Sequence, residues 1–567
     1  MVKYFLLYFY LILIISSILG YGFLLAKFLN KNLLKYNLGY IGILGLLALV
    51  LISYTTTFFV RHDYVHNSII HFIGLISFFF FFYKEKLNKD YILLIILIFF
   101  LSSALFILKN HDDFPFYHLT YALSLTENKI QLGLGNLGHQ YRYHSSLFHL
   151  NSLIFLPYIK FYLFHSVGFI TLIFVNFICL SFILNKKEFN NFNYIYIFYL
   201  LIFAYINIKF YRIGAYGTDI AAQLIVLVLI PLVLITIKKS LSKSEFESNI
   251  QLLILFISYI ITVKTYFIVY SLFLFLILIL FYKRSYFIRL FFVSRVTIIA
   301  TLTFVLFSLM NLSYTGCMIY PLKETCFSKQ IPWSLSQKEA QRIKLWFEQW
   351  SKGGASPNYG VENPKEYIKK FNWVKGWIDI YFFNKGLENL ASILFLSVLF
   401  IIIFYRNKKK FPESFDKNLY KFLFIVIILF CEWFYKHPAL RYGGYSLLAS
   451  LVFLPTSLFL SNSSIEKKTK KKLITTIVVA SLLIFNVRNI KRIDKEIKLY
   501  NSSSFPFFYI PQGDAELINL NEGINVYIPK NIDGCWATKT PCAGGFDNIK
   551  AKKKFGFNIF LNKHKLK

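Results

Sequence analysis

The chain has 567 residues, of which 56% are hydrophobic and only 28 are acidic, and its mean hydropathy is +0.54. The hydrophobic share exceeds the roughly 45–50% of soluble domains, which excludes a soluble globular protein and indicates a membrane protein. The 62 Lys and Arg residues leave a net charge of +34. They collect in short loops between apolar runs, so membrane orientation and contact with anionic lipid explain the charge without nucleic-acid binding.

Apolar runs close to the ~20 residues that cross a bilayer recur along the chain and predict an all-α polytopic fold with about 13–14 transmembrane helices. There are too many runs for a signal peptide or a single anchor, and no cleavable signal is evident. Several runs are short, so tilted helices or local thinning of the bilayer must accommodate them. The predicted spans are residues 4–29, 38–60, 68–83, 91–108, 166–185, 194–211, 219–237, 250–264, 265–282, 296–313, 389–405, 418–435, 444–461 and 473–488.

These spans divide the chain into two parts. Residues 1–488 are expected to form the transmembrane domain, with large outer loops at 109–165 and 314–388, and residues 489–567 a small outer C-terminal segment. Residues 146–165, "SLFHLNSLIFLPYIKFYLFH", are predicted to be interfacial or re-entrant. A crossing there would invert the parity of every span before it.

The loops on alternate sides of these spans separate into a lysine-rich set and a lysine-poor set. The positive-inside rule places the lysine-rich set in the cytoplasm and the lysine-poor set in the periplasm or outside the cell. The lysine-rich loops are 84–90, 185–193, 238–246, 282–295, 405–417 and 465–472. The lysine-poor segments are 61–67, 109–165, 212–219, 262–265, 314–388, 436–445 and the tail from residue 489.

Four of the six cysteines fall in outer segments. Cys317 and Cys326 share one loop, and Cys535 and Cys542 share the tail, so two short-range disulfides are expected in an oxidising compartment. Zinc is the alternative, but C-x8-C and C-x6-C are poor spacings for that metal. The other two, Cys179 and Cys431, fall within spans and are expected to be packing residues.

Adjacent carboxylates follow the span 91–108, in the stretch "HDDFPFYH". Asp112 or Asp113 can accept a proton from a hydroxyl nucleophile, and each raises the proton affinity of the other by charge repulsion. The alternative is that both merely cap the helix that begins near Phe114–Pro115, with proline in its first turn.

Two basic residues stand in other outer turns. Lys264 interrupts the long apolar stretch 250–282, which fits two short spans that meet at a turn, and an intramembrane charge commonly faces a site. Snorkelling to the interface is the alternative. Arg441 lies in "HPALRYGGY", where its guanidinium can bind a phosphate in a bidentate manner, although most loop arginines only set topology.

Further candidates for binding a substrate or a lipid phosphate lie in the same outer segments. They are His111, His118, Arg142, His144, His437 and Tyr442. The histidines can hydrogen-bond to sugar hydroxyls or pack in the interior, and no HExxH or comparable spacing predicts a metal site. No phosphate-binding loop or cytoplasmic nucleotide-binding domain is evident either. Energy for a reaction must therefore arrive in the substrate.

This arrangement resembles the GT-C class of membrane glycosyltransferases, which use polyprenyl-phosphate sugars at the outer face of membranes. In that class an acidic residue, often in a pair, lies in the first large outer loop, as in "HDD" at 111–113. A lysine commonly stands in a turn between two short spans, as in "TVKT" at 262–265, although the glycine of the family turn is missing here. Uncharacterised bacterial relatives carry elements like "YTGCMIYPLKETCF" and "CWATKTPC".

The resemblance implies a GT-C-like fold and an inverting sugar transfer in a bacterial inner membrane. Asp112 or Asp113 would take the acceptor proton, while Lys264 and Arg441 would stabilise the lipid phosphate that departs. The implied partners are a polyprenyl-phosphate sugar, an acceptor that is a glycan, lipid or protein, and membrane lipids. No cofactor is predicted, because no second outer carboxylate cluster is suited to a divalent metal. The alternatives are an O-antigen polymerase or ligase, and a transporter or flippase of lipid-linked sugars.

Overall fold

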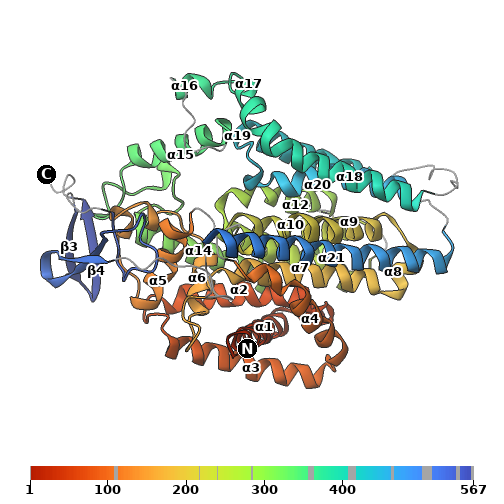
Figure 1. The fold of residues 1–567 in the computed structure, drawn as a ribbon, viewed down its shortest axis with the longest axis horizontal. Helices are drawn as coiled ribbons and strands as arrows, with labels where there is room; N and C mark the ends of the chain where they lie inside the picture. The colour runs from red at the N-terminus through yellow and green to blue at the C-terminus, as the bar shows by residue number, and fades with distance from the viewer. Residues whose placement is uncertain are drawn as a thin grey trace.

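A computed structural model describes residues 2–107, 113–215, 218–238, 241–281, 285–354, 363–405, 417–461, 465–500, 514–544 and 549–562. Most of these residues are helical, and the long helices lie side by side in one bundle (Figure 1). The helices are α1 (Val2–Leu29), α2 (Leu38–Thr56), α3 (Tyr64–Lys84), α4 (Asn88–Leu101), α5 (Leu119–Glu127), α6 (Ser146–Leu153), α7 (Ser166–Leu184), α8 (Lys186–Asn191), α9 (Tyr194–Lys209), α10 (Asp219–Thr236), α11 (Lys243–Val263), α12 (Leu272–Phe281), α13 (Ser285–Phe292), α14 (Arg295–Thr315), α15 (Gln337–Lys352), α16 (Pro364–Tyr367), α17 (Val374–Trp377), α18 (Leu387–Phe404), α19 (Lys417–Lys436), α20 (Gly444–Leu460) and α21 (Lys467–Tyr500).

Within the described residues, eleven helices are long and apolar enough to cross a membrane. They are α1, α2, α3, α4, α7, α10, α11, α14, α18, α19 and α21, some extended by short helical turns at their ends. Three shorter apolar helices are α9, α20 and α12 together with the 3-10 turn η7 (Thr265–Ser271) before it. These helices account for all the predicted spans, so the all-α polytopic architecture is confirmed.

The segment predicted to be interfacial or re-entrant does not cross the bundle. It forms α6, which is only eight residues long and is fully buried, followed by a series of turns. Polar contacts hold it in place, since the Ser53 hydroxyl lies 3.0 Å from Nδ1 of His149 and the Ser152 hydroxyl lies 2.8 Å from Nδ1 of His62. A buried segment of this polarity needs such partners, which explains why it stays inside the protein.

Glycines let the first three helices approach closely. A Cβ atom on Gly20 of α1 would lie 1.9 Å from the carbonyl oxygen of Gly74 on α3. One on Gly45 of α2 would lie 1.9 Å from the carbonyl oxygen of Ile18 on α1. Small residues of this kind permit backbone-to-backbone packing between membrane helices.

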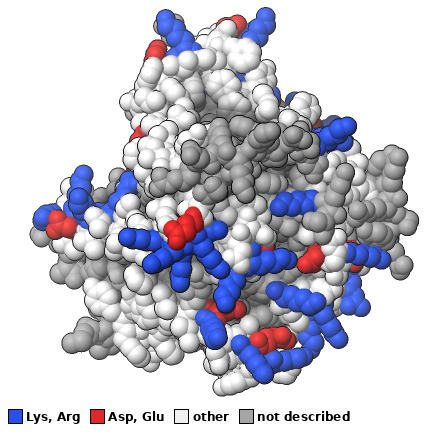
Figure 2. Space-filling model, turned by 90° about the vertical axis from the view of Figure 1, so that its right-hand side faces the viewer, with Lys and Arg blue, Asp and Glu red and all other residues white. Residues whose placement is uncertain are grey.

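The loops that are rich in lysine lie at one end of the bundle. Lys470 donates from Nζ to the carbonyl oxygen of Phe189 at 2.9 Å, and Arg295 donates to that of Phe28 at 2.9 Å, which joins segments far apart in the sequence. Figure 2 looks onto this end, on the right of Figure 1, and shows Lys and Arg side chains gathered across it. We call it the lysine-rich end and define it by the described residues of loops 30–37, 84–90, 185–193, 282–295 and 465–472.

The opposite end carries the long loops and the C-terminal strands, on the left of Figure 1. We call it the loop-rich end and define it by the described residues of 113–165, 314–388 and 514–562. Strands β1 (Ala515–Asn519) and β2 (Asn525–Pro529) form one antiparallel hairpin, and β3 (Ile549–Lys554) and β4 (Phe557–Asn562) form another. The second hairpin is joined to the loop 113–165, because the N–H of Phe560 donates to the carbonyl oxygen of Leu132 at 2.9 Å.

The end of the last helix differs from its prediction. The last span was expected to end at residue 488, with the outer segment starting directly after it, but α21 continues to Tyr500. The extension carries charged residues and is not apolar. Within it, Arg492 forms an ion pair with Glu496 at 3.1 Å. Charged residues of this kind end a hydropathy-based span without ending the helix.

Candidate functional site

Four charged residues from four separate segments meet at the loop-rich end. Arg441 donates from Nε to Oδ2 of Asp219 at 2.6 Å and from a terminal nitrogen to Oδ2 of Asp113 at 3.3 Å. Lys264 donates from Nζ to the other oxygen of Asp219. The Asp219 side chain is only 5% exposed, whereas that of Asp113 is 34% exposed. Asp219 is therefore the buried centre of this cluster, and Asp113 is its open edge.

Helix α10 positions Asp219 and also holds the loop that carries Arg441. Asp219 is the first residue of α10, where the partial positive charge of a helix N-terminus favours a carboxylate. One turn further on, the Gln223 amide donates to the carbonyl oxygens of Leu440 and Arg441, both at 3.2 Å. The Gln223 oxygen accepts from the N–H of Ser446 at 3.2 Å. The short turn η10 (Leu440–Tyr442) is thus fixed to α10.

Lys264 occupies the turn between two apolar helices, as the sequence predicted. Its backbone is extended, its N–H closes the last turn of α11 on Ile260, and η7 starts at the next residue. The Ser145 hydroxyl donates to the carbonyl oxygen of Val263 at 2.8 Å, which ties the end of α11 to the loop 113–165. The ammonium lies 4.4 Å from the centre of the Tyr442 ring. This places Lys264 within the cluster rather than at a lipid-facing surface.

Asp113 precedes a short π-helix, η3 (Phe114–His118), which leads directly into α5. Within the described stretch 113–118, its side chain makes no cap hydrogen bond to the backbone of this helix. Its Oδ2 atom instead accepts from the Tyr117 hydroxyl at 3.3 Å and from Arg441. The carboxylate therefore faces the cluster. Its neighbour Asp112 lies outside the described residues, as does His111.

Aromatic rings pack against both cations of the cluster, Arg441 and Lys264. The Arg441 guanidinium lies 5.2 Å from the centre of the Trp350 ring, and Tyr442 supports Lys264. His437 packs its ring against Tyr442 at 5.1 Å, and burial lowers its pKa to about 4, so the imidazole is neutral at neutral pH. Cation–π contacts in a desolvated site contribute about 2 kcal/mol and fix the direction of the charged groups.

Helix α15 brings Trp350 to this position. The Ser351 hydroxyl accepts from the N–H of Ala439 at 3.0 Å, directly beside the Arg441 turn. At the other end of α15, Arg142 donates to Glu339 at 2.7 Å. Arg142, one of the residues predicted to bind substrate, lies in this ion pair, which anchors α15 to the loop 113–165.

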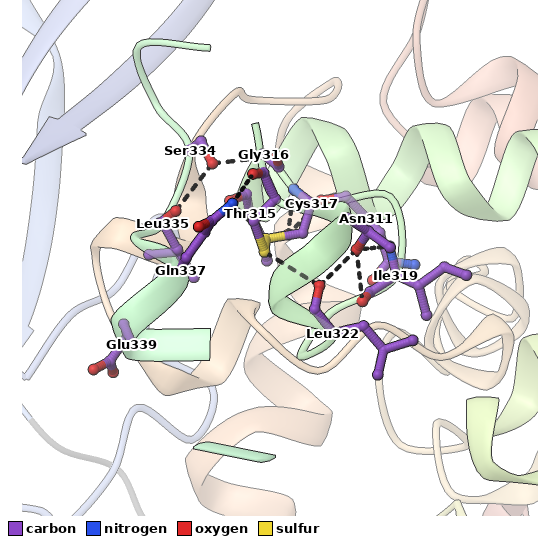
Figure 3. Close-up of a disulfide and its surroundings, with 12 residues drawn as sticks. Asn311, Thr315, Gly316, Cys317, Ile319, Leu322, Ser334, Leu335, Gln337 and Glu339 are labelled. Carbon is purple, nitrogen blue, oxygen red and sulfur yellow. Dashed lines mark hydrogen bonds between the residues drawn. A yellow bond between two sulfur atoms is a disulfide. The ribbon is translucent and has the colours of Figure 1, made fainter. Parts of the chain in front are cut away.

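A disulfide holds the chain that leads into α15. Cys317 and Cys326 are bonded at the turn after α14 (Figure 3). The Ser334 hydroxyl donates to the carbonyl oxygen of Gly316 at 3.2 Å, which holds the returning chain against the end of α14. Gly316 has φ +71, in the left-handed region that favours glycine, and ends α14 at this point. The fixed end of α14 thus sets where α15 begins.

The C-terminal segment is hydrogen-bonded to the start of the helical segment that follows Asp113. The N–H of Trp536 donates to the carbonyl oxygen of Pro115 at 2.9 Å. Gly534 has φ +80, and a Cβ atom there would lie 3.0 Å from the same oxygen. Contact this close leaves room only for glycine.

The same C-terminal loop, residues 535–542, is also hydrogen-bonded to the far end of α5. Glu127 accepts from the N–H and from the hydroxyl of Thr540, both at 2.6 Å. A disulfide between Cys535 and Cys542 closes the loop that makes these contacts. Both ends of the helical segment after Asp113 are therefore held by one covalent ring.

The two carboxylates and two cations of the cluster sum to zero charge, but the pKa values of the two cations shift in opposite directions. Burial disfavours the charged guanidinium of Arg441, but the combined attraction of its neighbours, with Asp219 the strongest of them, outweighs this and raises its pKa well above the ordinary value. Burial is the dominant effect on Lys264 and lowers its pKa, although Asp219 favours the charged form. Arg441 is thus a permanent cation, whereas Lys264 depends on an anionic neighbour to stay charged.

The remaining predicted residues have other surroundings. His144 lies between two tyrosine hydroxyls, 2.7 Å from that of Tyr121 and 3.0 Å from that of Tyr54. His118 packs on Tyr117 and Phe148 and lines a small, mostly apolar pocket beside the cluster. In the described part of the chain, no three His, Cys, Asp or Glu side chains are grouped so as to hold a metal ion.

Sequence reasoning missed Asp219, Gln223 and Trp350. A signal for Asp219 exists, because it stands in an outer turn, "RIGAYGTD", directly before an apolar helix, as the Asp112–Asp113 pair stands directly after one. Gln223 is a polar residue inside an apolar run, which commonly faces a helix partner. Trp350 had no comparable signal in a chain with 20% aromatic residues.

No curated protein and no solved structure matches this chain. A family model does match it over residues 1–448. The match includes Asp113, Asp219, Lys264 and Arg441, and it stops before the C-terminal strands. The chain therefore belongs to the family described as a domain of unknown function, DUF8201.

Proposed function

We propose that this protein is a GT-C-class membrane glycosyltransferase that moves a sugar from a polyprenyl-phosphate donor to a hydroxyl acceptor. The acceptor is a glycan, a lipid or a protein. The observation that carries the proposal is the partly open carboxylate of Asp113, which lies 3.3 Å from a guanidinium nitrogen of Arg441. A proton acceptor next to a phosphate-binding cation is what a direct transfer of this kind requires.

The charge distribution supports a site at the outer face of a bacterial inner membrane. Asp113 and Arg441 lie at the loop-rich end, opposite the lysine-rich end. The positive-inside rule puts the lysine-rich end in the cytoplasm. Both disulfides lie at the loop-rich end, which fits an oxidising compartment.

The proposed reaction is a single displacement at the anomeric carbon. The acceptor oxygen forms its bond to that carbon while the bond from the carbon to the phosphate oxygen breaks, and the leaving group is the polyprenyl phosphate. Asp113 takes the acceptor proton, and Lys264 and Arg441 bind the phosphate before and after the bond breaks. One displacement inverts the anomeric configuration.

Asp219 acts as a positioning residue in this scheme. It accepts hydrogen bonds from both cations and is too buried to reach an acceptor. Lys264 and Arg441 are held next to each other because both pair with this one carboxylate. Preorganised donors of this kind stabilise the charge of a leaving group without further rearrangement.

The direct test is a transfer assay with purified protein and a radiolabelled polyprenyl-phosphate sugar. We expect Arg441→Met and Lys264→Met each to weaken donor binding about 10- to 100-fold and also to slow turnover, since a hydrogen bond to a charged group contributes about 1.5–3 kcal/mol. Arg61→Met is the matched control, because Arg61 is an exposed outer-loop residue.

The assay also separates the alternatives. Movement of labelled lipid across a vesicle membrane with no new glycosidic bond would identify a flippase. Transfer of preassembled glycan chains from a lipid diphosphate, with no use of the monophosphate donor, would identify a polymerase or ligase. Either result would replace the proposed function.

The C-terminal loop gives a further prediction. The double variant Cys535→Ser, Cys542→Ser lacks the disulfide, and its C-terminal loop should hold Pro115 and Glu127 less firmly. We expect the transfer rate to fall about 10- to 100-fold, which is the effect of a misplaced catalytic group. Donor binding should stay unchanged, because Lys264 and Arg441 stand on other elements.

The control for this variant is Cys431→Ser, which replaces an exposed free cysteine. Radioligand binding and transfer are measured on the same preparations. Equal losses of binding and transfer would show general damage to the site rather than displacement of Asp113.

A further inference from the structure

The lysine-rich end carries a pocket that the proposed reaction does not use. It lies where the end of α1, the short 3-10 helix η1 (Lys31–Lys35) and the end of α3 come together. Its lining residues are Lys27, Lys31, Leu34, Lys35, Lys84 and Glu85. Four ammonium groups and one carboxylate therefore surround a single concave site.

The lysines of this pocket lack the carboxylate partners that other lysines have. In the described residues, none of the four forms an ion pair, whereas Lys352 pairs with Glu348 at 2.7 Å and Lys209 with Glu388 at 3.1 Å. Four like charges that converge on one carboxylate leave an excess of positive charge, and a bound anion lowers the repulsion among them.

An aromatic ring helps to bring two of these ammonium groups together. Lys27 from α1 lies 5.7 Å from the centre of the Phe80 ring, and Lys84 lies 5.8 Å from the same centre. The attraction of a ring face for cations accounts for this arrangement. It leaves the remaining N–H donors of both ammonium groups available to a ligand.

The pocket borders surface that faces lipid. Phe28, Phe80 and Tyr83, at the ends of the two membrane helices that form it, are 57%, 55% and 76% exposed. Aromatic residues at this level of a membrane protein lie beside the headgroups. A ligand in the pocket would thus have its charge among the lysines and its apolar part along α1 and α3.

We propose that this pocket binds the phosphate of an anionic phospholipid headgroup. Lysine suits this ligand, because its ammonium is a point charge on a flexible stem that adapts to a phosphodiester. Each lysine near an anionic membrane surface adds to the attraction for that surface. The site is independent of the sugar-transfer proposal, since it lies at the other end of the bundle.

The experiment compares two triple variants of the full-length protein in phosphatidylcholine nanodiscs that contain phosphatidylglycerol. The pocket variant is Lys31→Gln, Lys35→Gln, Lys84→Gln. The control variant changes three exposed lysines at the start of α21 on the same end, Lys468→Gln, Lys471→Gln and Lys472→Gln. Both remove the same charge, so nonspecific attraction to the membrane falls equally in the two.

Native mass spectrometry and thermal unfolding provide the readouts. For the control variant and the unchanged protein we expect retained phosphatidylglycerol adducts and a higher melting temperature than in pure phosphatidylcholine, because a ligand stabilises the state that it binds. For the pocket variant we expect at least a fivefold loss of adducts and no such rise in melting temperature.

Three outcomes would overturn the proposal. Equal adduct loss in both variants would mean that the basic face attracts anionic lipid without a defined site. Displacement of the lipid by millimolar inorganic phosphate or pyrophosphate, with the same stabilisation, would identify a site for a soluble phosphate. Unchanged adducts in the pocket variant would exclude the pocket as the binding site.

Discussion

Asp113→Asn is expected to lower the sugar-transfer rate by about 10²–10⁴-fold, the contribution of general base catalysis. Asparagine keeps the size of the side chain and an oxygen that accepts from Tyr117, but it cannot take a proton from the acceptor. Folding and donor binding should be preserved, because Arg441 and Lys264 are still held by Asp219. The measurement is the turnover rate at saturating donor, with donor affinity determined separately.

Two companion variants make this result specific. Asp379→Asn changes an exposed carboxylate at the same end of the protein and should leave transfer unchanged. Asp112→Asn tests the other member of the pair and is expected to cause the smaller loss, by altering the proton affinity of Asp113. Full activity in both Asp113→Asn and Asp112→Asn would show that the "HDDFPFYH" stretch has no catalytic role.

Asp219→Asn is expected to destabilise the protein by on the order of 3 kcal/mol, since it leaves two cations together in a largely buried site with one carboxylate lost. Donor binding should also weaken, because Lys264 and Arg441 lose the group that orients them. Thermal unfolding in detergent and donor binding at low temperature measure the two effects on one preparation.

A double variant distinguishes this ion-pair effect from simple loss of packing. In Asp219→Asn, Lys264→Met, one of the two cations is removed as well, so part of the lost stability should return. Additive losses in the double variant would indicate that Asp219 and Lys264 are not coupled. Asp379→Asn again serves as the control, with an expected change within about 0.5 kcal/mol.

The membrane fold was predictable because it depends on local properties of the chain. A run of apolar residues of bilayer length must form a helix in lipid, whatever lies beside it. Successive spans place successive loops on alternate sides of the membrane, so the order of the spans alone divides the loops into a lysine-rich set and a lysine-poor set. Cys317 with Cys326 and Cys535 with Cys542 were expected to pair for a similarly local reason, since each pair is less than ten residues apart, and the structure has both disulfides.

The candidate site was only partly predictable. Asp113, Lys264 and Arg441 were selected because each is a charge in a polar turn beside an apolar helix, and the structure brings these three together. The same reasoning selected Arg142, which the structure pairs with Glu339 instead. Charge and turn position indicate that a residue is near the membrane surface, but they do not identify its partner.

What the sequence by itself determined, then, is the class of protein, the positions of the spans, the separation of lysine-rich from lysine-poor loops and a set of charged candidates. Only the tertiary structure decided that Asp219 joins Lys264 to Arg441, that Trp350 lies under the guanidinium, and that the C-terminal loop holds the segment after Asp113. These contacts join segments far apart in the chain, and they depend on which helices pack together. Hydropathy indicates which segments form membrane helices, whereas helix packing in lipid is set by side-chain shape and polar pairing between neighbours, which a single span does not reveal.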